Sequence, residues 1–142
     1  MIPQKVKALF EKQALVAFAT ADKNGKPNVV PVFWKKISGN CTILLIDNYF
    51  NATKSNLLEN KNACLAFWNP ETEEAYKLKG QANYHFSGKV FEQGKAFLQS
   101  KKSGRIPRGV VELRVKEIFT ITPGPDAGKQ IKGISSPAYY QA

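Results

Sequence analysis

The chain contains very little histidine, cysteine or methionine, and no hydrophobic run approaches the length needed to cross a membrane. Its one histidine, His85, disfavours Ser-His-Asp and Cys-His catalysis, which need an imidazole beside a nucleophile. The two cysteines, Cys41 and Cys64, lack the spacing of metal ligands, so we expect free thiols and no metal site. A Gly-x-Gly-x-x-Gly turn is also missing, which disfavours a Rossmann unit. We therefore assign no catalytic residue.

A secretion signal is missing as well, because residues 1–5 lead directly into an amphipathic segment. We therefore expect a cytoplasmic protein without a membrane segment. With 142 residues, of which 43% are hydrophobic and 23% charged, the chain has the size and composition of one globular domain. We expect residues 1–142 to form that single domain.

Acidic residues are scarce: 21 Lys and Arg stand against 11 Asp and Glu, which gives a formal net charge of +10. The excess is even along the chain, with nine basic and four acidic residues in 1–70 and twelve and seven in 71–142. Such spread charge favours anionic ligands in general and is weak evidence for DNA or RNA. The densest basic run, 101–108, is interpreted as a solvated helix end and loop, with a phosphate or partner contact as the alternative.

Hydrophobic periodicity predicts six strands and three helices. The strands are expected near 15–20, 27–37, 42–47, 63–68, 76–86 and 111–121, and the helices near 3–10, 51–60 and 88–102. Asp22–Gly25 predicts a hairpin with a type I′ turn, and Glu117 interrupts the last strand in a way that indicates a bulge. Because hairpin-type links join most strands, we expect a mainly β fold, an antiparallel barrel or sandwich with peripheral helices.

The helix start at 51–60 predicts a small anion site. An N-cap at Asn51 would leave the backbone amides of Ala52, Thr53 and Lys54 without carbonyl partners inside the helix. Those donors, the positive end of the helix dipole and the Lys54 ammonium favour a negative group.

The strand before this helix predicts the rest of the ligand. Phe33 and Trp34 are adjacent in a strand and so point to opposite faces, which leaves one of them in need of a second apolar surface. A ligand or a subunit partner would supply that surface. A flat apolar strand beside a phosphate site predicts a planar ring with a phosphate tail, the shape of flavin mononucleotide (FMN).

The order of these segments resembles the FMN-binding split-barrel superfamily, which includes pyridoxamine 5′-phosphate oxidases and small FMN-binding proteins. The matching pieces are Val29–Phe33, Ile43–Asp47, Thr53–Leu57 and Lys79–Ala82, within about residues 5–121. No single motif is highly specific, so the order and spacing carry the resemblance. The resemblance implies a six-stranded antiparallel split β-barrel that forms a homodimer, with FMN bound in grooves at the subunit interface.

The resemblance also implies which residues contact the cofactor. The strand from Val30 to Trp34 would lie along the isoalloxazine ring, and the loop from Asp47 to Asn51 would border the ring and ribityl chain. Thr53 and Lys54 would hold the phosphate. The expected FMN-binding residues are Val30, Pro31, Val32, Phe33, Trp34, Asp47, Asn48, Asn51, Thr53, Lys54 and Asn56.

The chain departs from the oxidases at positions that matter for their substrate. Thr53 stands where they carry an arginine, the ring-contacting glutamine near Ala75 is missing, and residues 134–142 lack their arginine and histidine pair. We therefore expect a small flavin-dependent oxidoreductase or electron carrier and do not predict oxidation of vitamin B6. Two alternatives stay open: a basic β-barrel module that stacks bases beside the lysines of Trp34–Lys36, and the same fold with a deazaflavin or haem.

Overall fold

The computed structural model describes residues 1–101 and 104–131. In that part of the chain it contains α1 (Gln4–Lys12), β1 (Val16–Ala21), β2 (Pro27–Val32), β3 (Lys35–Ile37), β4 (Thr42–Asp47), α2 (Ala52–Glu59), β5 (Asn62–Trp68), β6 (Ala75–His85), α3 (Gly88–Ser100) and β7 (Gly109–Thr120). Over the same residues, every helix is too short or too polar to span a membrane. The prediction of a mainly β fold is confirmed.

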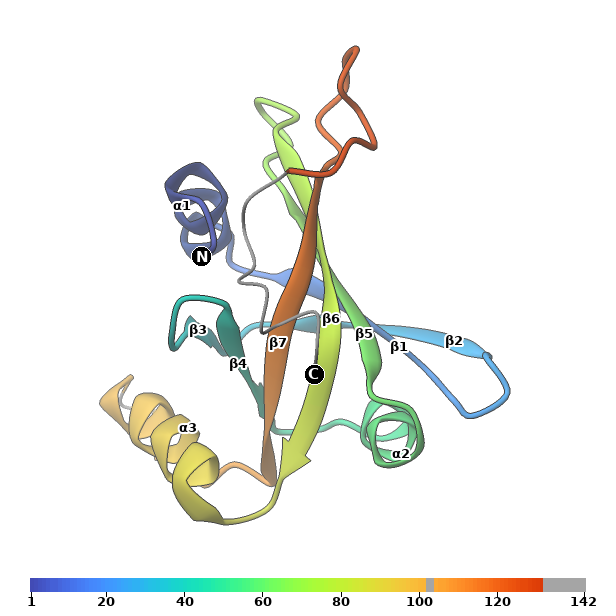
Figure 1. Cartoon of the computed structure of the whole chain (residues 1–142). Helices are drawn as coiled ribbons and strands as arrows, with labels where there is room; N and C mark the ends of the chain where they lie inside the picture. The colour runs from blue at the N-terminus through green and yellow to red at the C-terminus, as the bar shows by residue number, and fades with distance from the viewer. Residues whose placement is uncertain (102–103, 132–142) are drawn as a thin grey trace.

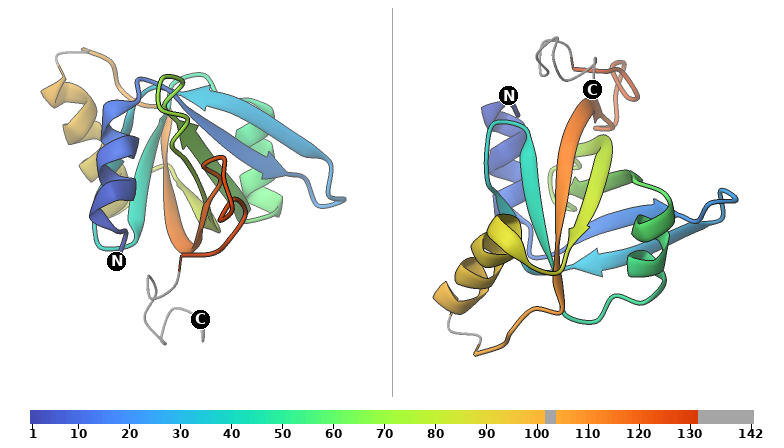
Figure 2. Two further views of the ribbon diagram at one scale, coloured as in Figure 1. Left: turned by 90° about the horizontal axis from the view of Figure 1, so that it is seen from above. Right: turned by 60° about the horizontal axis from the view of Figure 1, so that its bottom comes forward.

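The strands form one curled antiparallel sheet in the order β2-β1-β5-β6-β7-β4-β3 (Figures 1 and 2). The two edge strands of this order, β2 and β3, follow one another directly in the chain. The helices pack on the sheet, with α1 against β5, α2 against β1, β2 and β6, and α3 against β4, β6 and β7. The sheet therefore curls into a split barrel whose opening lies between consecutive segments of the chain.

Strand β4 separates two apolar clusters. Ile43 and Leu45 belong to the main core inside the curled sheet, whereas Leu44 and Ile46 face outward and pack with Leu98 of α3. Alternate side chains of a strand point to opposite faces, so both faces of β4 are covered. This explains why the strand is a continuous apolar run rather than an alternating one.

Within residues 1–101 and 104–131 there are seven strands where six were expected, because the stretch 27–37 forms two strands. Strand β2 ends at Val32, and β3 begins at Lys35, with Phe33 and Trp34 in neither. Strand β2 pairs with β1, and β3 pairs with β4 at the opposite edge of the sheet. The chain must cross from one edge to the other at this point. The sequence gives no indication of that crossing, because residues 29–34 are all apolar.

The hairpin predicted at Asp22–Gly25 joins β1 to β2, but its turn is not type I′. The Oδ1 atom of Asp22 accepts hydrogen bonds from the backbone N–H groups of Asn24 (2.9 Å) and Lys26 (2.8 Å). Gly25 has a φ of +86° while Asn24 does not have a positive φ, and a type I′ turn requires positive values at both central residues. The Asp22 side chain therefore supports a longer turn that ends in a single left-handed glycine.

The bulge predicted near Glu117 is present. Lys79 of β6 pairs with Glu117 of β7, but its neighbour Gly80 pairs with Val115, so one residue of β7 is left over. The two backbones approach closely here, because a methyl group at position 80 would collide with the backbone oxygen of Arg114. Glycine is required at this point because no side chain fits between the strands.

Candidate functional site

A cleft of about 700 Å³ opens beside the break between β2 and β3. Small-molecule sites commonly have volumes of roughly 300–1,000 Å³, with mainly apolar walls and a few polar groups. This cleft fits that description. Its lining residues are Val30, Pro31, Val32, Phe33, Trp34, Ile46, Asn48, Tyr49, Phe50 and Arg105.

The strand break supplies an aromatic wall. The Phe33 and Trp34 rings meet edge to face, with 4.8 Å between their centroids. Trp34 packs against the cluster under α3, and its carbonyl oxygen accepts a hydrogen bond from the Ile46 N–H at 3.0 Å. The Phe33 side chain is 53% exposed. Phe33 is therefore the member of the pair that still lacks an apolar surface.

The loop after β4 also lines the cleft, and Asp47 holds this loop in place. Asp47 is completely buried, and its carboxylate accepts hydrogen bonds from the Tyr84 hydroxyl and from the Phe50 N–H at 2.6 Å. Its backbone oxygen accepts a third, from the Arg108 N–H at 2.9 Å. The fixed loop leaves Tyr49 77% exposed at the cleft. Asp47 thus shapes the cleft without lining it.

The Tyr84 hydroxyl is kept protonated by its surroundings. Burial, the hydrogen bond to Asp47 and the charge of that carboxylate raise the pKa of Tyr84 above its usual value, and the charge of Arg108 opposes them. Gly109 gives the tyrosine ring its space, since a methyl group at that position would collide with the ring. Tyr84 therefore remains a hydrogen-bond donor to Asp47 at neutral pH.

The start of α2 is occupied largely by contacts within the protein. Thr53 is completely buried, and its hydroxyl accepts a hydrogen bond from the Asn28 side-chain amide at 3.1 Å. Asn56 is 7% exposed and donates to the Thr20 hydroxyl at 3.1 Å. Asn51 stands at the N-cap position but makes no side-chain capping hydrogen bond. These polar side chains tie α2 to β1 and β2.

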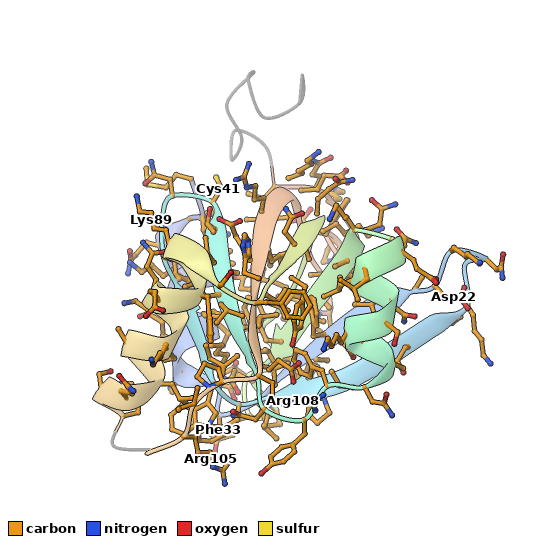
Figure 3. The ribbon with its side chains drawn as sticks, turned by 90° about the horizontal axis from the view of Figure 1, so that it is seen from below. Asp22, Phe33, Cys41, Lys89, Arg105 and Arg108 are labelled. Atoms are coloured by element: carbon orange, nitrogen blue, oxygen red, sulfur yellow. The ribbon has the colours of Figure 1, made fainter. Side chains whose placement is uncertain are left out.

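Three cations surround the Tyr84 region and the cleft. The Lys54 ammonium lies 5.5 Å from the Tyr84 ring centroid and 4.9 Å from that of Phe86. Arg108 acts electrostatically on Tyr84, and Arg105 lines the cleft. Figure 3 shows Arg105, Arg108 and Phe33 together on the face of the molecule seen from below. An anionic group in this region would therefore meet positive charge from two separate segments.

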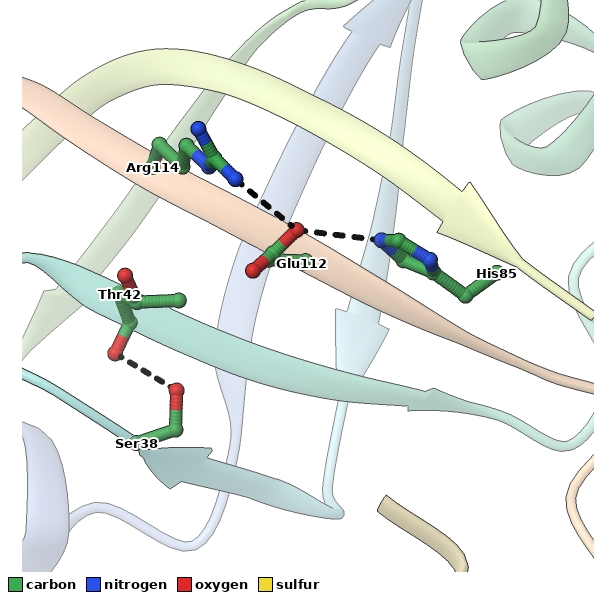
Figure 4. A network of polar contacts seen from close by, with 5 residues as sticks. All are labelled: Ser38, Thr42, His85, Glu112 and Arg114. Atoms are coloured by element: carbon green, nitrogen blue, oxygen red, sulfur yellow. Dashed lines mark hydrogen bonds and ion pairs between the residues drawn. The ribbon is translucent and has the colours of Figure 1, made fainter. Parts of the chain in front are cut away.

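The histidine lies elsewhere, on the outer face of β6. Its Nε2 atom is 3.1 Å from Oε1 of Glu112, and the Arg114 guanidinium is 3.9 Å from the same oxygen (Figure 4). His85 is not among the residues that line the cleft. Its partners on β7 give it a place in a surface polar network.

Six of the residues expected to bind FMN line the cleft, namely the run Val30–Trp34 and Asn48. The others that were expected, Asp47, Asn51, Thr53, Lys54 and Asn56, do not line it. Tyr49 and Phe50 also line the cleft, within the loop 47–51 that was expected to border the ring, whereas Ile46 and Arg105 were not expected there. The sequence did contain an indication for Arg105, because this residue belongs to the basic run 101–108, for which a phosphate or partner contact was the alternative interpretation. Residues 102 and 103 of that run lie outside the described part.

A curled antiparallel sheet that is open between its edge strands β2 and β3 has the architecture of a split barrel, and the cleft of about 700 Å³ lies at that opening. The family model for pyridoxamine 5′-phosphate oxidase matches residues 2–122, so the chain belongs to that family. The resemblance inferred from the sequence is confirmed.

Individual relatives agree with this assignment. An uncharacterized protein of Methanocaldococcus jannaschii is 33% identical over 130 residues, which cover 90% of this chain and 85% of that protein. HupZ of Group A Streptococcus is similar in structure, with a TM-score of 0.80 and 29% identity over 90% of this chain and 100% of that one. An FMN-binding protein of Syntrophomonas wolfei subsp. wolfei has a TM-score of 0.68 and 14% identity over 82% of each chain, a likeness of fold alone.

Proposed function

We propose that this chain is an FMN-binding flavoprotein that acts as a small oxidoreductase or electron carrier. One observation carries the proposal: the residues that the resemblance assigns to the ring, Val30–Trp34 and Asn48, line a single cleft of about 700 Å³. That volume lies in the range typical of cofactor sites. Membership in the pyridoxamine 5′-phosphate oxidase family and the fold shared with an FMN-binding protein support it.

The cleft residues fit a planar ring with a polar edge. When bound, FMN supplies hydride or electron exchange. Phe33 and Tyr49, which are 53% and 77% exposed, offer apolar faces that would exclude water from a flat ring. The Asn48 amide and the backbone N–H groups of Phe33 and Trp34, which lie outside β2 and β3, would hydrogen-bond the polar edge. No residue is assigned as a general base.

The phosphate end of the proposed site relies on charge. Lys54 and Arg108 lie beside Tyr84, and Arg105 lines the cleft. The free backbone amides at the start of α2 would add the helix dipole. The Thr53 hydroxyl is enclosed, so a contact from Thr53 to the phosphate would come from its N–H group.

A homodimer is part of the proposal, and an apolar outer face supports it. Leu15, Val29 and Trp68 are 56%, 64% and 51% exposed on this face, around a second cavity of about 330 Å³. Val30 and Pro31 line both this cavity and the proposed flavin cleft. A second copy that covers the outer face would therefore reach the edge of the cleft.

The dimer is tested by placing charge on that face. Val29→Glu with Trp68→Glu should convert a dimer to a monomer in sedimentation velocity, because two buried carboxylates would disfavour the interface. Lys23→Glu, which changes the net charge by the same amount in the exposed β1–β2 hairpin, is the matched control and should leave the mass unchanged.

The flavin proposal is tested by the visible absorption spectrum of the purified protein, followed by chromatography of the chromophore released by heat. Yellow protein that releases FMN is the expected result. A deazaflavin or haem in the released fraction would keep the fold and replace the ligand. Colourless protein that also fails to take up added FMN would contradict the proposal and favour the nucleic-acid alternative.

A further inference from the structure

Two aromatic rings at the end of β6 contact the same lysine of α2. The ring centroids of Tyr84 and Phe86 are 4.8 Å apart, and the ring planes are tilted by 59°. The Lys54 ammonium lies 5.5 Å from the Tyr84 centroid and 4.9 Å from the Phe86 centroid. An aromatic face attracts a cation within about 6 Å of its centroid, so both rings attract the Lys54 ammonium.

The rings hold this ammonium without using its hydrogen-bond donors. Within residues 1–101 and 104–131, no carboxylate oxygen lies within 4.0 Å of the Lys54 ammonium. An ammonium has three N–H donors, and an aromatic face attracts its charge without a lone pair that accepts them. A carboxylate in place of the rings would accept those donors and would also repel an incoming anion. The ring pair therefore leaves Lys54 available to an anionic group.

Tyr84 also connects Lys54 to the loop at the flavin cleft. Its hydroxyl donates a hydrogen bond to Asp47, whose carboxylate accepts another from the Phe50 N–H at 2.6 Å. Phe50 and Asn48 line the cleft. Because the hydroxyl of Tyr84 contacts this loop while its ring contacts the lysine, one side chain fixes the Lys54 ammonium relative to the cleft.

A second contact between lysines and an aromatic ring provides a comparison within the same chain. The ammonium groups of Lys77 and Lys79 lie 5.1 Å and 5.4 Å from the Phe119 ring centroid. Lys77 of β6 pairs directly with Phe119 of β7, so the register of the sheet is enough to bring these side chains together. Phe119 is not among the residues that line the flavin cleft.

We propose that Tyr84 and Phe86 are positioning residues that hold the Lys54 ammonium for a phosphate and make the site selective for the phosphorylated flavin. The inference deepens the proposed function and rests on it. A lysine extended into water loses side-chain freedom when it pairs with an anion, whereas a lysine already held by two rings loses less. Lys54 should therefore favour FMN over riboflavin, which has the same ring system without the phosphate.

The selectivity is measured as the dissociation constant of riboflavin divided by that of FMN. Both ligands carry the isoalloxazine ring, so a change at the ring end alters both constants and cancels in the ratio. Phe86→Leu keeps an apolar side chain without the aromatic face, and the ratio should fall about fivefold, the size of one cation–π contact. Phe86→Tyr restores an aromatic face and should recover the ratio. An unchanged ratio in Phe86→Leu would overturn the proposal.

Two further variants separate the phosphate end from the rest of the protein. Tyr84→Phe keeps the ring beside Lys54 but removes the donor to Asp47, so both flavins should bind more weakly with little change in the ratio. Phe119→Leu removes a ring that contacts two other lysines and should alter neither constant. Equal falls of the ratio in Phe119→Leu and Phe86→Leu would reduce the effect to general electrostatics and overturn the proposal.

A double-mutant cycle tests whether Phe86 acts through Lys54. Lys54→Met removes the charge but keeps a long unbranched side chain, and it should lower the ratio more than any of the other variants. In this background Phe86→Leu should cause no further fall, because no ammonium is left for the ring to hold. A further fall of the same size would mean that Phe86 contacts the ligand itself, and the positioning role would be wrong.

Nuclear magnetic resonance of the FMN-free protein detects the contact without a flavin. The ring currents should shift the Lys54 ε-CH₂ protons upfield of those of exposed lysines, a signal assigned by its loss in Lys54→Met. Phe86→Leu should reduce this shift and Phe119→Leu should preserve it; an unshifted signal in the unsubstituted protein would overturn the proposal. Protein that binds neither flavin contradicts the proposed function and this inference with it. Equal affinities for FMN and riboflavin, in protein that binds both, overturn this inference alone.

Discussion

The two ends of the proposed flavin site differ in how much of their chemistry is free to bind a ligand. At the ring end, Phe33 is 53% exposed and lines an open cleft with Asn48. At the other end of the site, which α2 forms, Thr53 and Asn56 are buried, and their side chains hydrogen-bond Asn28 and Thr20. Both ends were inferred from the sequence in the same way. The ring end exposes its side chains to the cleft, whereas the side chains of α2 form hydrogen bonds within the protein.

This difference teaches that a motif locates a site more reliably than it assigns the task of each residue. A hydroxyl or amide at a helix start serves equally well to bind an anion or to anchor the helix to neighbouring strands. In this chain the anchoring role is visible at Thr53 and Asn56. The charge for a phosphate is therefore expected from Lys54, Arg105 and Arg108.

Asp47 holds the loop between β4 and α2, and its removal should give the largest loss of stability. Asp47→Ala deprives Tyr84 and the Phe50 N–H of their buried acceptor. We expect a loss of about 3 kcal/mol in the free energy of unfolding, measured by urea denaturation. Asp126→Ala, which breaks only an exposed ion pair with Lys129, is the control and should cost less than about 0.5 kcal/mol. Equal effects would mean that Asp47 does not organise the site.

Variants of Thr53 test whether the side chains at the start of α2 stabilise the fold or bind the ligand. Thr53→Val keeps the shape but leaves the Asn28 amide without its acceptor, so we expect a loss of about 1.5 kcal/mol in stability. Thr53→Ser keeps the hydroxyl and should recover most of that loss. FMN affinity should fall strongly in Lys54→Ala and change little in Thr53→Val. A large loss of FMN affinity with unchanged stability in Thr53→Val would assign the hydroxyl to the ligand and break the contrast.

The raised pKa of Tyr84 makes stability depend on alkaline pH. An unfolded tyrosine loses its proton near pH 10, whereas folded Tyr84 keeps it because of burial and Asp47. The unfolded state therefore binds fewer protons above pH 10, and the free energy of unfolding falls as the pH rises. The fall should be about 1 kcal/mol by pH 11 after solvent screening of this partly exposed ring is allowed for. In Tyr84→Phe the alkaline fall should be smaller by that amount; an unchanged pH profile would contradict this account.

Phe33 should give the smallest effect on stability. Because half of its side chain is exposed, Phe33→Ala should change the free energy of unfolding by no more than about 0.5 kcal/mol. Its FMN affinity should nevertheless fall about tenfold, since an aromatic face at the ring is lost. Leu58→Ala removes a similarly exposed side chain from α2 and should alter neither quantity. Unchanged FMN affinity in Phe33→Ala would place the ring outside this cleft.

Local patterns were sufficient for much of the fold, and tertiary contacts decided the rest. The bulge near Glu117 followed from broken alternation, and the strand at 76–86 from clean alternation. The break at Phe33 and Trp34 was missed because an apolar run does not reveal a change of strand partner. Arg105 was missed as a lining residue because its position depends on how the segment after α3 returns to the sheet.

The strand break also has a mechanical consequence. Among the residues that the structure describes, β2 and β3 are the two edge strands of the sheet, so each is paired on one side only, and Phe33 and Trp34 connect them. A ligand bound against these two residues would contact the segment that joins the two edge strands, and would therefore restrict the motion of both strands. Occupancy should therefore slow amide hydrogen exchange in both edge strands together, while the continuously paired strands β5 and β6 keep their rates.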